Sequence, residues 1–85
     1  MSVSMITGSQ IRSARSALRW SVEELAKRSA VSPRTIKRME VDSGTPNSTA
    51  ANIAAIRTAL EAAGIEFIGT PTDRPGIRIG APKAD

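Results

Sequence analysis

The sequence contains no cysteine and no histidine, and these two absences exclude several kinds of chemistry. Without cysteine the chain has no disulfide and no thiolate nucleophile, and without histidine as well it lacks the usual ligands of zinc. The absence of histidine also means that the commonest general base, imidazole, is missing, so the serines and threonines have no evident activating partner. We therefore expect no catalytic residue, no metal site and no cofactor, and we predict that the protein is not an enzyme.

Long apolar runs are absent as well. No stretch approaches the roughly 20 apolar residues that a membrane-spanning helix needs. The opening segment, MSVSMITG, also lacks the basic and apolar regions of a signal peptide. We expect a cytoplasmic protein with no membrane partner, and the missing cysteines agree with a reducing compartment.

The residues that are present indicate one small folded domain with an uneven charge. The chain has 85 residues, of which 40% are hydrophobic and 24% charged, so disorder is not expected. Its net charge of +4 hides a contrast: residues 9–38 hold eight basic and two acidic side chains, whereas the remainder holds four basic and six acidic ones. A basic half favours a surface that binds a polyanion, and the alternative is a solvated helix surface.

Segments in the first half have the periodicity and the start signals of short helices. The first helix is expected to begin near Ser9, capped by Thr7 or by Ser9 itself, and to end at about residues 19–20. The second follows Ser21, whose hydroxyl can accept a hydrogen bond from the Glu24 amide while Glu24 reaches back. That reciprocal arrangement is a capping box.

The third helix is expected to begin at Pro33 after the cap Ser32, because proline needs no hydrogen bond at the first helical position. Ile36 and Met39 then define its buried side. The exposed side must carry donors and positive charge, from Arg34, Thr35, Lys37 and Arg38. We therefore expect two short helices at a sharp angle, of which the second has a cationic face.

The second half of the sequence has the pattern of a longer helix, after which the spacing of apolar residues is no longer helical. Asn47 or Ser48 is expected to cap this helix, apolar residues recur at helical intervals from Ile53 to Ala63, and Gly64 ends it. Two short strand-prone runs and a loop rich in proline and glycine come next, over residues 65–68, 77–79 and 69–76 respectively.

The order of these residues resembles the helix-turn-helix domain of the Cro and phage-repressor family, also called the xenobiotic-response-element (XRE) family. The resemblance covers residues 9–60 and rests on Arg15, Ser21, Glu24, Leu25, Ala26, Val31, Ser32, Thr35, Ile36, Met39, Glu40, Gly44 and Pro46. It implies a mostly α fold, a compact repressor-like helix-turn-helix domain of four to five helices, and the strand-prone runs add a short C-terminal β-hairpin. It also implies a prokaryotic or phage-type regulator of transcription.

In that family the third helix lies in the major groove of double-stranded DNA, and the second helix crosses the sugar–phosphate backbone. The resemblance therefore implies base contacts from Pro33, Arg34, Lys37 and Arg38. Guanidinium groups can bridge O6 and N7 of guanine, which favours the two arginines as guanine contacts. Contacts to the DNA backbone are implied for Ser21, Thr35 and Thr45. A buried structural ion pair is implied between Arg15 and Glu40.

One short recognition helix covers too few base pairs to single out an operator, so we expect a homodimer on a (pseudo)palindromic site. We assign residues 1–64 to the DNA-binding domain and residues 65–85 to a strand extension and tail that supplies the dimer interface. The apolar side chains of that interface are Ile65, Phe67, Ile68, Ile77 and Ile79. The strands can fold back on the preceding helix or pair with a second chain, and we favour the second alternative.

Two positions depart from the family pattern. Val22 replaces the glutamine with which many members bond a phosphate, and Pro33 replaces a frequent polar base-contacting residue. They support an alternative function, a module that binds a protein, such as an antiactivator or antitoxin, and does not contact DNA. The cationic third helix favours the DNA-binding function and a nucleoid-associated location. We expect no small-molecule ligand, because the residues beyond the fold are too few for a sensing domain.

Overall fold

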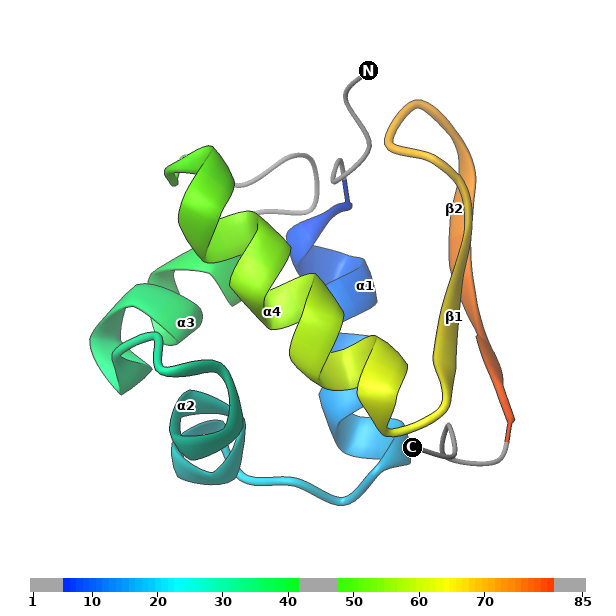
Figure 1. The fold of residues 1–85 in the computed structure, drawn as a ribbon. Coiled ribbons are helices and arrows are strands. Elements are labelled where there is room, and N and C mark those ends of the chain that lie inside the picture. Colours follow the sequence, from blue (N-terminus) through cyan, green and yellow to red (C-terminus); the bar gives the residue numbers. More distant parts are fainter. Residues whose placement is uncertain (1–5, 42–47, 81–85) are drawn as a thin grey trace.

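The computed structural model describes residues 6–41 and 48–80, which form four helices followed by a two-stranded antiparallel hairpin. The elements are α1 (Gly8–Ala17), α2 (Val22–Ser29), α3 (Pro33–Glu40), α4 (Ala50–Ala62), β1 (Ile65–Thr70) and β2 (Asp73–Ile79). In Figure 1, α4 crosses the molecule between α2 and α3 on one side and the hairpin on the other. The predicted mostly helical fold with a C-terminal hairpin is confirmed. Within the described residues, none of the helices has both the length and the apolar character required to span a bilayer.

Each helix begins after a hydroxyl side chain whose oxygen accepts a hydrogen bond from a backbone N–H three residues further on. The caps are Thr7, Ser21, Ser32 and Thr49. Such a cap stabilises its helix by about 1 kcal/mol. The predictions of Ser21 and Ser32 are confirmed, but the prediction of Asn47 or Ser48 is wrong. The extended backbone of Thr49 places its hydroxyl on the first turn of α4, and Asn47 lies outside the described residues.

A reciprocal capping box occurs at α1 and not at α2. At α2 the Ser21 hydroxyl accepts from the Glu24 amide as predicted, but the Glu24 carboxylate accepts from Arg28 Nε at 2.6 Å. At α1 the Thr7 hydroxyl accepts from the Gln10 amide at 3.0 Å, and Gln10 Oε1 accepts from the Thr7 amide at 2.8 Å. The predicted role of Glu24 is therefore wrong, because an arginine one turn further along takes its carboxylate.

Two helices are followed by left-handed residues that are not glycine. α1 ends at Ala17, earlier than the predicted residues 19–20, because Arg19 has a φ of 60°. α2 is followed by Ala30, which has a φ of 62° and donates its amide hydrogen to Ala26 O at 2.8 Å. This conformation costs a residue with a Cβ about 1–2 kcal/mol. The packing of the helices on either side must therefore hold both turns.

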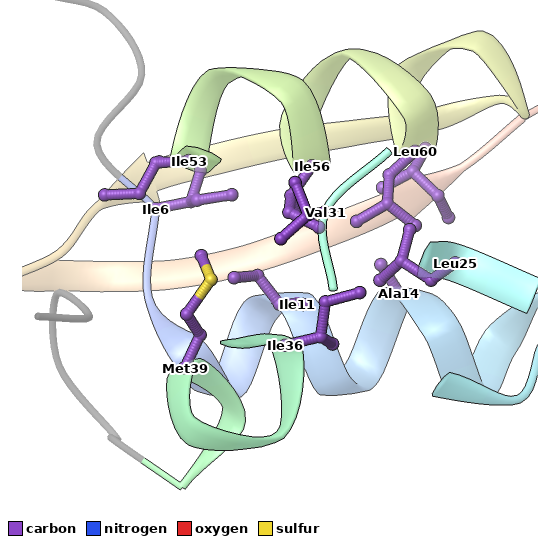
Figure 2. Packing of buried hydrophobic residues seen from close by; sticks show 11 residues of the cluster. Ile6, Ile11, Ala14, Leu25, Val31, Ile36, Met39, Ile53, Ile56 and Leu60 are labelled. Carbon is purple, nitrogen blue, oxygen red and sulfur yellow. The ribbon is translucent and has the colours of Figure 1, made fainter. Parts of the chain in front are cut away.

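One apolar core joins the four helices and the first strand. It consists of Ile6, Ile11, Ala14, Leu25, Val31, Ile36, Met39, Ile53, Ile56, Leu60 and Ile65. In Figure 2 the labelled side chains of α1, α3 and α4 point toward one another, with Leu25 of α2 beside them. The predicted buried residues Ile36 and Met39 of α3 and Ile53, Ile56 and Leu60 of α4 lie in this core and are confirmed. Ala63, predicted to continue the stripe of α4, caps the end of that helix and is only half-buried.

The hairpin differs from its prediction in the length of its loop. The predicted loop over residues 69–76 is wrong, because both strands continue into it and only residues 71–72 lie between them. Gly69, with a φ of +75°, lies at an irregularity in the register, where an added Cβ would be 2.2 Å from Arg74 O. Pro75 is tolerated inside β2 because each strand of a two-stranded sheet is an edge strand.

The inner face of the hairpin packs on its own chain. The register pairs Ile65 with Ile79 and Phe67 with Ile77, and residues directly opposite one another share a face. Ile65 belongs to the core, and Phe67 and Ile77 pack against it. This face therefore covers α1 and α4, on the side of the molecule opposite α2 and α3.

Candidate nucleic-acid interface

The turn between α2 and α3 fixes where α3 begins. Ala30 ends α2 in a left-handed conformation, and only Val31 and Ser32 separate it from the start of α3. Val31 is buried in the core, whereas Ser32 caps α3 and Pro33 stands in its first turn. The turn is thus anchored at its centre, and α3 packs as a separate short helix against α1 and α2.

The exposed side of α3 carries three positive charges. Arg34, Lys37 and Arg38 are exposed, and none of them has a hydrogen bond or an ion pair with a described residue. Spacings of three and four residues place them on one face, opposite the buried Ile36 and Met39. Like charges at these spacings destabilise a helix by about 0.2–0.5 kcal/mol per pair. An anionic ligand would remove that repulsion.

Pro33 and Thr35, also predicted to contact DNA, lie in the first turn of α3. Pro33 is exposed and presents only apolar ring atoms. Thr35 is half-buried, and its hydroxyl oxygen accepts from Ser32 Oγ at 2.9 Å while its amide donates to the same Ser32 oxygen at 3.2 Å. Thr35 therefore takes part in the cap of α3 as well as in its surface.

Ser21, predicted to contact the DNA backbone, lies at the N-terminal end of α2. Its side chain is exposed, and its hydroxyl oxygen accepts from the Glu24 amide at 3.0 Å. Glu23 and Glu24 occupy the first turn of α2, where negative charge favours the helix but opposes a nearby phosphate. Thr45, the remaining residue of this set, lies outside the described residues, as do Gly44 and Pro46.

Arg15 of α1 and Glu40, the last residue of α3, form a bidentate ion pair. Arg15 Nε donates to Glu40 Oε2 at 2.8 Å, and Arg15 Nη2 donates to Glu40 Oε1 at 2.9 Å. The third nitrogen, Nη1, donates to Trp20 O at 3.0 Å. The hydrogen bond with Glu40 raises the pKa of Arg15 above its ordinary value, against the lowering effect of burial. One side chain of α1 thus holds both the end of α3 and the entry to α2.

The pair is also well shielded from solvent. Only 18% of the Arg15 side chain and 8% of the Glu40 side chain are exposed. An ion pair in this setting is screened little by salt, and either partner alone would be a partly buried charge without compensation. Arg15 and Glu40 therefore lie together in a shielded position, where the pair stabilises the fold and is not part of the exposed surface.

The apolar residues predicted for a dimer interface divide into two groups. Ile65 is buried, and Phe67, Ile68 and Ile77 are half-buried, so much of this set serves the chain itself. Ile79 is 61% exposed, one of two large apolar residues at the described surface. The interface between two chains stays a prediction.

Gln10 is a structural residue that the sequence interpretation missed. Only 4% of it is exposed, and its Nε2 donates to Ile68 O at 3.2 Å and to Gly76 O at 2.8 Å. The spacing of Thr7 and Gln10 is that of a capping box and could have predicted the first part of this network. Its bonds to the hairpin join residues 58 and 66 positions apart, a contact that no spacing shows.

Neither a scan of protein-family models nor a search of curated proteins finds a match to this chain. Within residues 6–41 and 48–80, no group of three or more histidine, cysteine, aspartate or glutamate side chains could hold a metal ion. What the site offers is positive charge and hydrogen-bond donors on the exposed side of one short helix, supported from behind by a shielded ion pair.

Proposed function

We propose that this protein is a sequence-specific DNA-binding regulator of transcription that binds a (pseudo)palindromic operator as a homodimer, with α3 in the major groove. The observation that carries the proposal is the exposed face of α3, where Arg34, Lys37 and Arg38 lie together without partners among the described residues. A helix with its side chains is about 10–12 Å wide, which fits a major groove about 12 Å wide. The short α2–α3 turn supports the helix-turn-helix docking mode of the family that the sequence resembles.

In this mode the residues of α3 have distinct roles. Arg34 near the start of the helix and Arg38 one turn later can each donate two hydrogen bonds to O6 and N7 of a guanine. Lys37 lies between them and donates to a third base acceptor, and Pro33 makes an apolar contact. Ser21, Thr35 and Thr45 bond the sugar–phosphate backbone and fix the register without specifying sequence.

Base contact by Arg34 and Arg38 is tested by substitution. Duplexes selected from a random library by the wild-type protein serve as probes in salt-titrated gel shifts, together with the DNA upstream of the gene. We expect Arg34→Ala and Arg38→Ala each to weaken binding by about 1–3 kcal/mol and to abolish preference at one base position per half-site.

The control is Arg78→Ala, which removes the same charge from the hairpin, where Arg78 is 68% exposed in a surface pair with Glu66. It should leave base preference unchanged. If the α3 variants weaken binding to all sequences equally and only lower the salt dependence, the two arginines contact phosphates and the assignment to bases is wrong.

The homodimer is tested at Ile79. Burying this side chain at a two-fold interface would contribute about 1.5–3 kcal/mol per copy, and the symmetry counts it twice. We expect Ile79→Glu to give a monomer in sedimentation equilibrium without a loss of folding stability. Val41→Glu is the matched control, because Val41 is 78% exposed and lies at the end of α3. A dimer that survives Ile79→Glu but dissociates on Val41→Glu would move the interface to the helices.

The second candidate function is binding to a protein, and Val22 is the observation that favours it. Val22 is half-buried and packs against the core, and its aliphatic side chain has no donor with which to bond a phosphate. The acidic first turn of α2 also opposes close approach of DNA. The random-library selection separates the candidates, since a folded wild-type protein that enriches no DNA sequence would favour the protein-binding module.

A further inference from the structure

The amide of Gln10 connects α1 to both strands of the hairpin. Its Oε1 accepts from the Thr7 amide at 2.8 Å, so its other end must be the NH₂ group. That group donates to Ile68 O in β1 and to Gly76 O in β2, two residues that lie directly opposite each other in the register. We call this set of three hydrogen bonds the Gln10 bridge.

The same helix is bonded to the proposed DNA-binding elements by a different residue. Arg15 lies five positions after Gln10, about 7.5 Å further along the helix axis. It bonds Glu40 at the end of α3 and Trp20 O at the entry to α2. Helix α1 is thus fixed to the hairpin through one side chain and to α2 and α3 through another.

The apolar contacts of the hairpin do not by themselves fix its direction. Ile65, Phe67 and Ile77 hold the hairpin against the core, but apolar burial depends on area and tolerates small rotations. Hydrogen bonds require a donor–acceptor distance of about 3 Å and weaken steeply at angles below about 120°. The Gln10 bridge imposes these requirements on both strands at once. The bridge is therefore the directional part of the attachment.

We propose that Gln10 is a positioning residue that holds the hairpin at a fixed angle to α3 and thereby sets the half-site spacing that the dimer accepts. This inference rests on the proposed function, with the hairpin as the interface between copies. The folded chain measures 29 × 26 × 24 Å. A tilt of about 10° at the hairpin would displace α3 by roughly 4 Å, more than the ~3.4 Å between successive base pairs.

The test compares spacing preference with half-site binding. Inverted pairs of the half-site selected by the wild-type protein are made with the preferred spacer and with one base pair more or less. We expect the wild-type protein to lose about tenfold in affinity at either altered spacer, because the DNA must twist to compensate. In Gln10→Leu, which has a similar volume but no amide, the loss should fall to about twofold, with isolated half-site affinity unchanged.

Two further variants and one further measurement keep the result interpretable. Gln10→Asn retains an amide that is one methylene too short to reach both strands, and it replaces Gln10→Leu if that variant does not fold. Asn52→Leu is the control, because among the described residues the Asn52 amide bonds only Ser48, just before α4. Amide hydrogen exchange should show faster opening of the hairpin in the Gln10 variants, with α2 and α3 unchanged.

The outcomes separate this inference from the function on which it rests. A wild-type protein that binds no DNA specifically overturns both. A sharp spacing preference that survives in both Gln10 variants overturns the positioning role alone. The same role is overturned if the variants lose affinity equally for isolated half-sites and for paired sites, which would make Gln10 a general structural residue. Relaxed spacing with intact half-site binding, absent from Asn52→Leu, supports it.

Discussion

The exposed face of α3 and the hairpin differ in whether their charged side chains form ion pairs. Arg34, Lys37 and Arg38 repel one another and have no counterion among the described residues. In the hairpin every charged side chain is paired, Arg74 with Asp73 at 3.1 Å and Arg78 with Glu66 at 3.3 Å. One surface therefore offers charge to an external anion. The charges of the hairpin are neutralised, and the large apolar side chain that it leaves exposed is Ile79, at the end of β2.

The two regions are also attached to the fold by different interactions. The end of α3 is attached through a shielded ion pair, whereas the hairpin is attached through apolar packing and two hydrogen bonds from one neutral amide. An ion pair loses most when one charge is removed, because the remaining charge stays buried without compensation. The hairpin should be most sensitive where its backbone is sterically constrained. These differences can be measured.

The largest effect is expected at Arg15. Arg15→Ala should lower the free energy of unfolding by about 3–5 kcal/mol, because Glu40 would remain buried without a partner. Urea denaturation measures this change, and Arg12→Ala, at an exposed position of the same helix, should alter stability little. The double variant Arg15→Leu/Glu40→Leu should be more stable than Arg15→Ala, since it removes both charges. Stability of Arg15→Ala within error of the Arg12→Ala value would show that the pair contributes nothing.

A smaller effect is expected in the hairpin at Gly69. Gly69→Ala combines a left-handed backbone with a Cβ 2.2 Å from Arg74 O, which cannot move without opening the turn. We expect a loss of about 2–3 kcal/mol in unfolding free energy, together with faster hydrogen exchange confined to the hairpin. Gly76→Ala is the matched control, because its Cβ would lie 3.5 Å from the flexible Ile68 side chain, an ordinary contact. Equal losses in the two variants would contradict the tight turn.

The smallest effect, and a stabilising one, is expected at Ala30 beside α3. Ala30→Gly relieves a left-handed conformation that costs about 1–2 kcal/mol for a residue with a Cβ, but it adds disorder to the unfolded chain. The net gain in unfolding free energy should be about 0.5–1 kcal/mol. The same substitution inside α4, Ala54→Gly, should instead lose about 1 kcal/mol. If both changes destabilise the protein equally, Ala30 does not bear the strain that its φ implies.

The accuracy of the sequence predictions varied between these regions for a physical reason. Ser32, Pro33 and the buried pair Ile36 and Met39 were sufficient to place α3, because each of these signals acts within four residues. The predicted cap of α4, Asn47 or Ser48, was one or two residues too early, since Ser48 and Thr49 carry the same chemical group. The loop of the hairpin was overestimated because glycine and proline mark both loops and irregular strands.

The sequence by itself determined the start of α3, its buried and exposed sides and therefore the cationic face, because the periodicity of one helix settles all three. The sequence also identified Arg15 and Glu40 as partners in an ion pair, through the family resemblance and not through the spacing of the two residues. Only the tertiary structure decided that α1 ends before Arg19 and that the strands extend toward residues 71–72. It alone revealed that Gln10 bonds Ile68 and Gly76, 58 and 66 residues away. Contacts at such separations depend on the packing of whole elements, which no local pattern encodes.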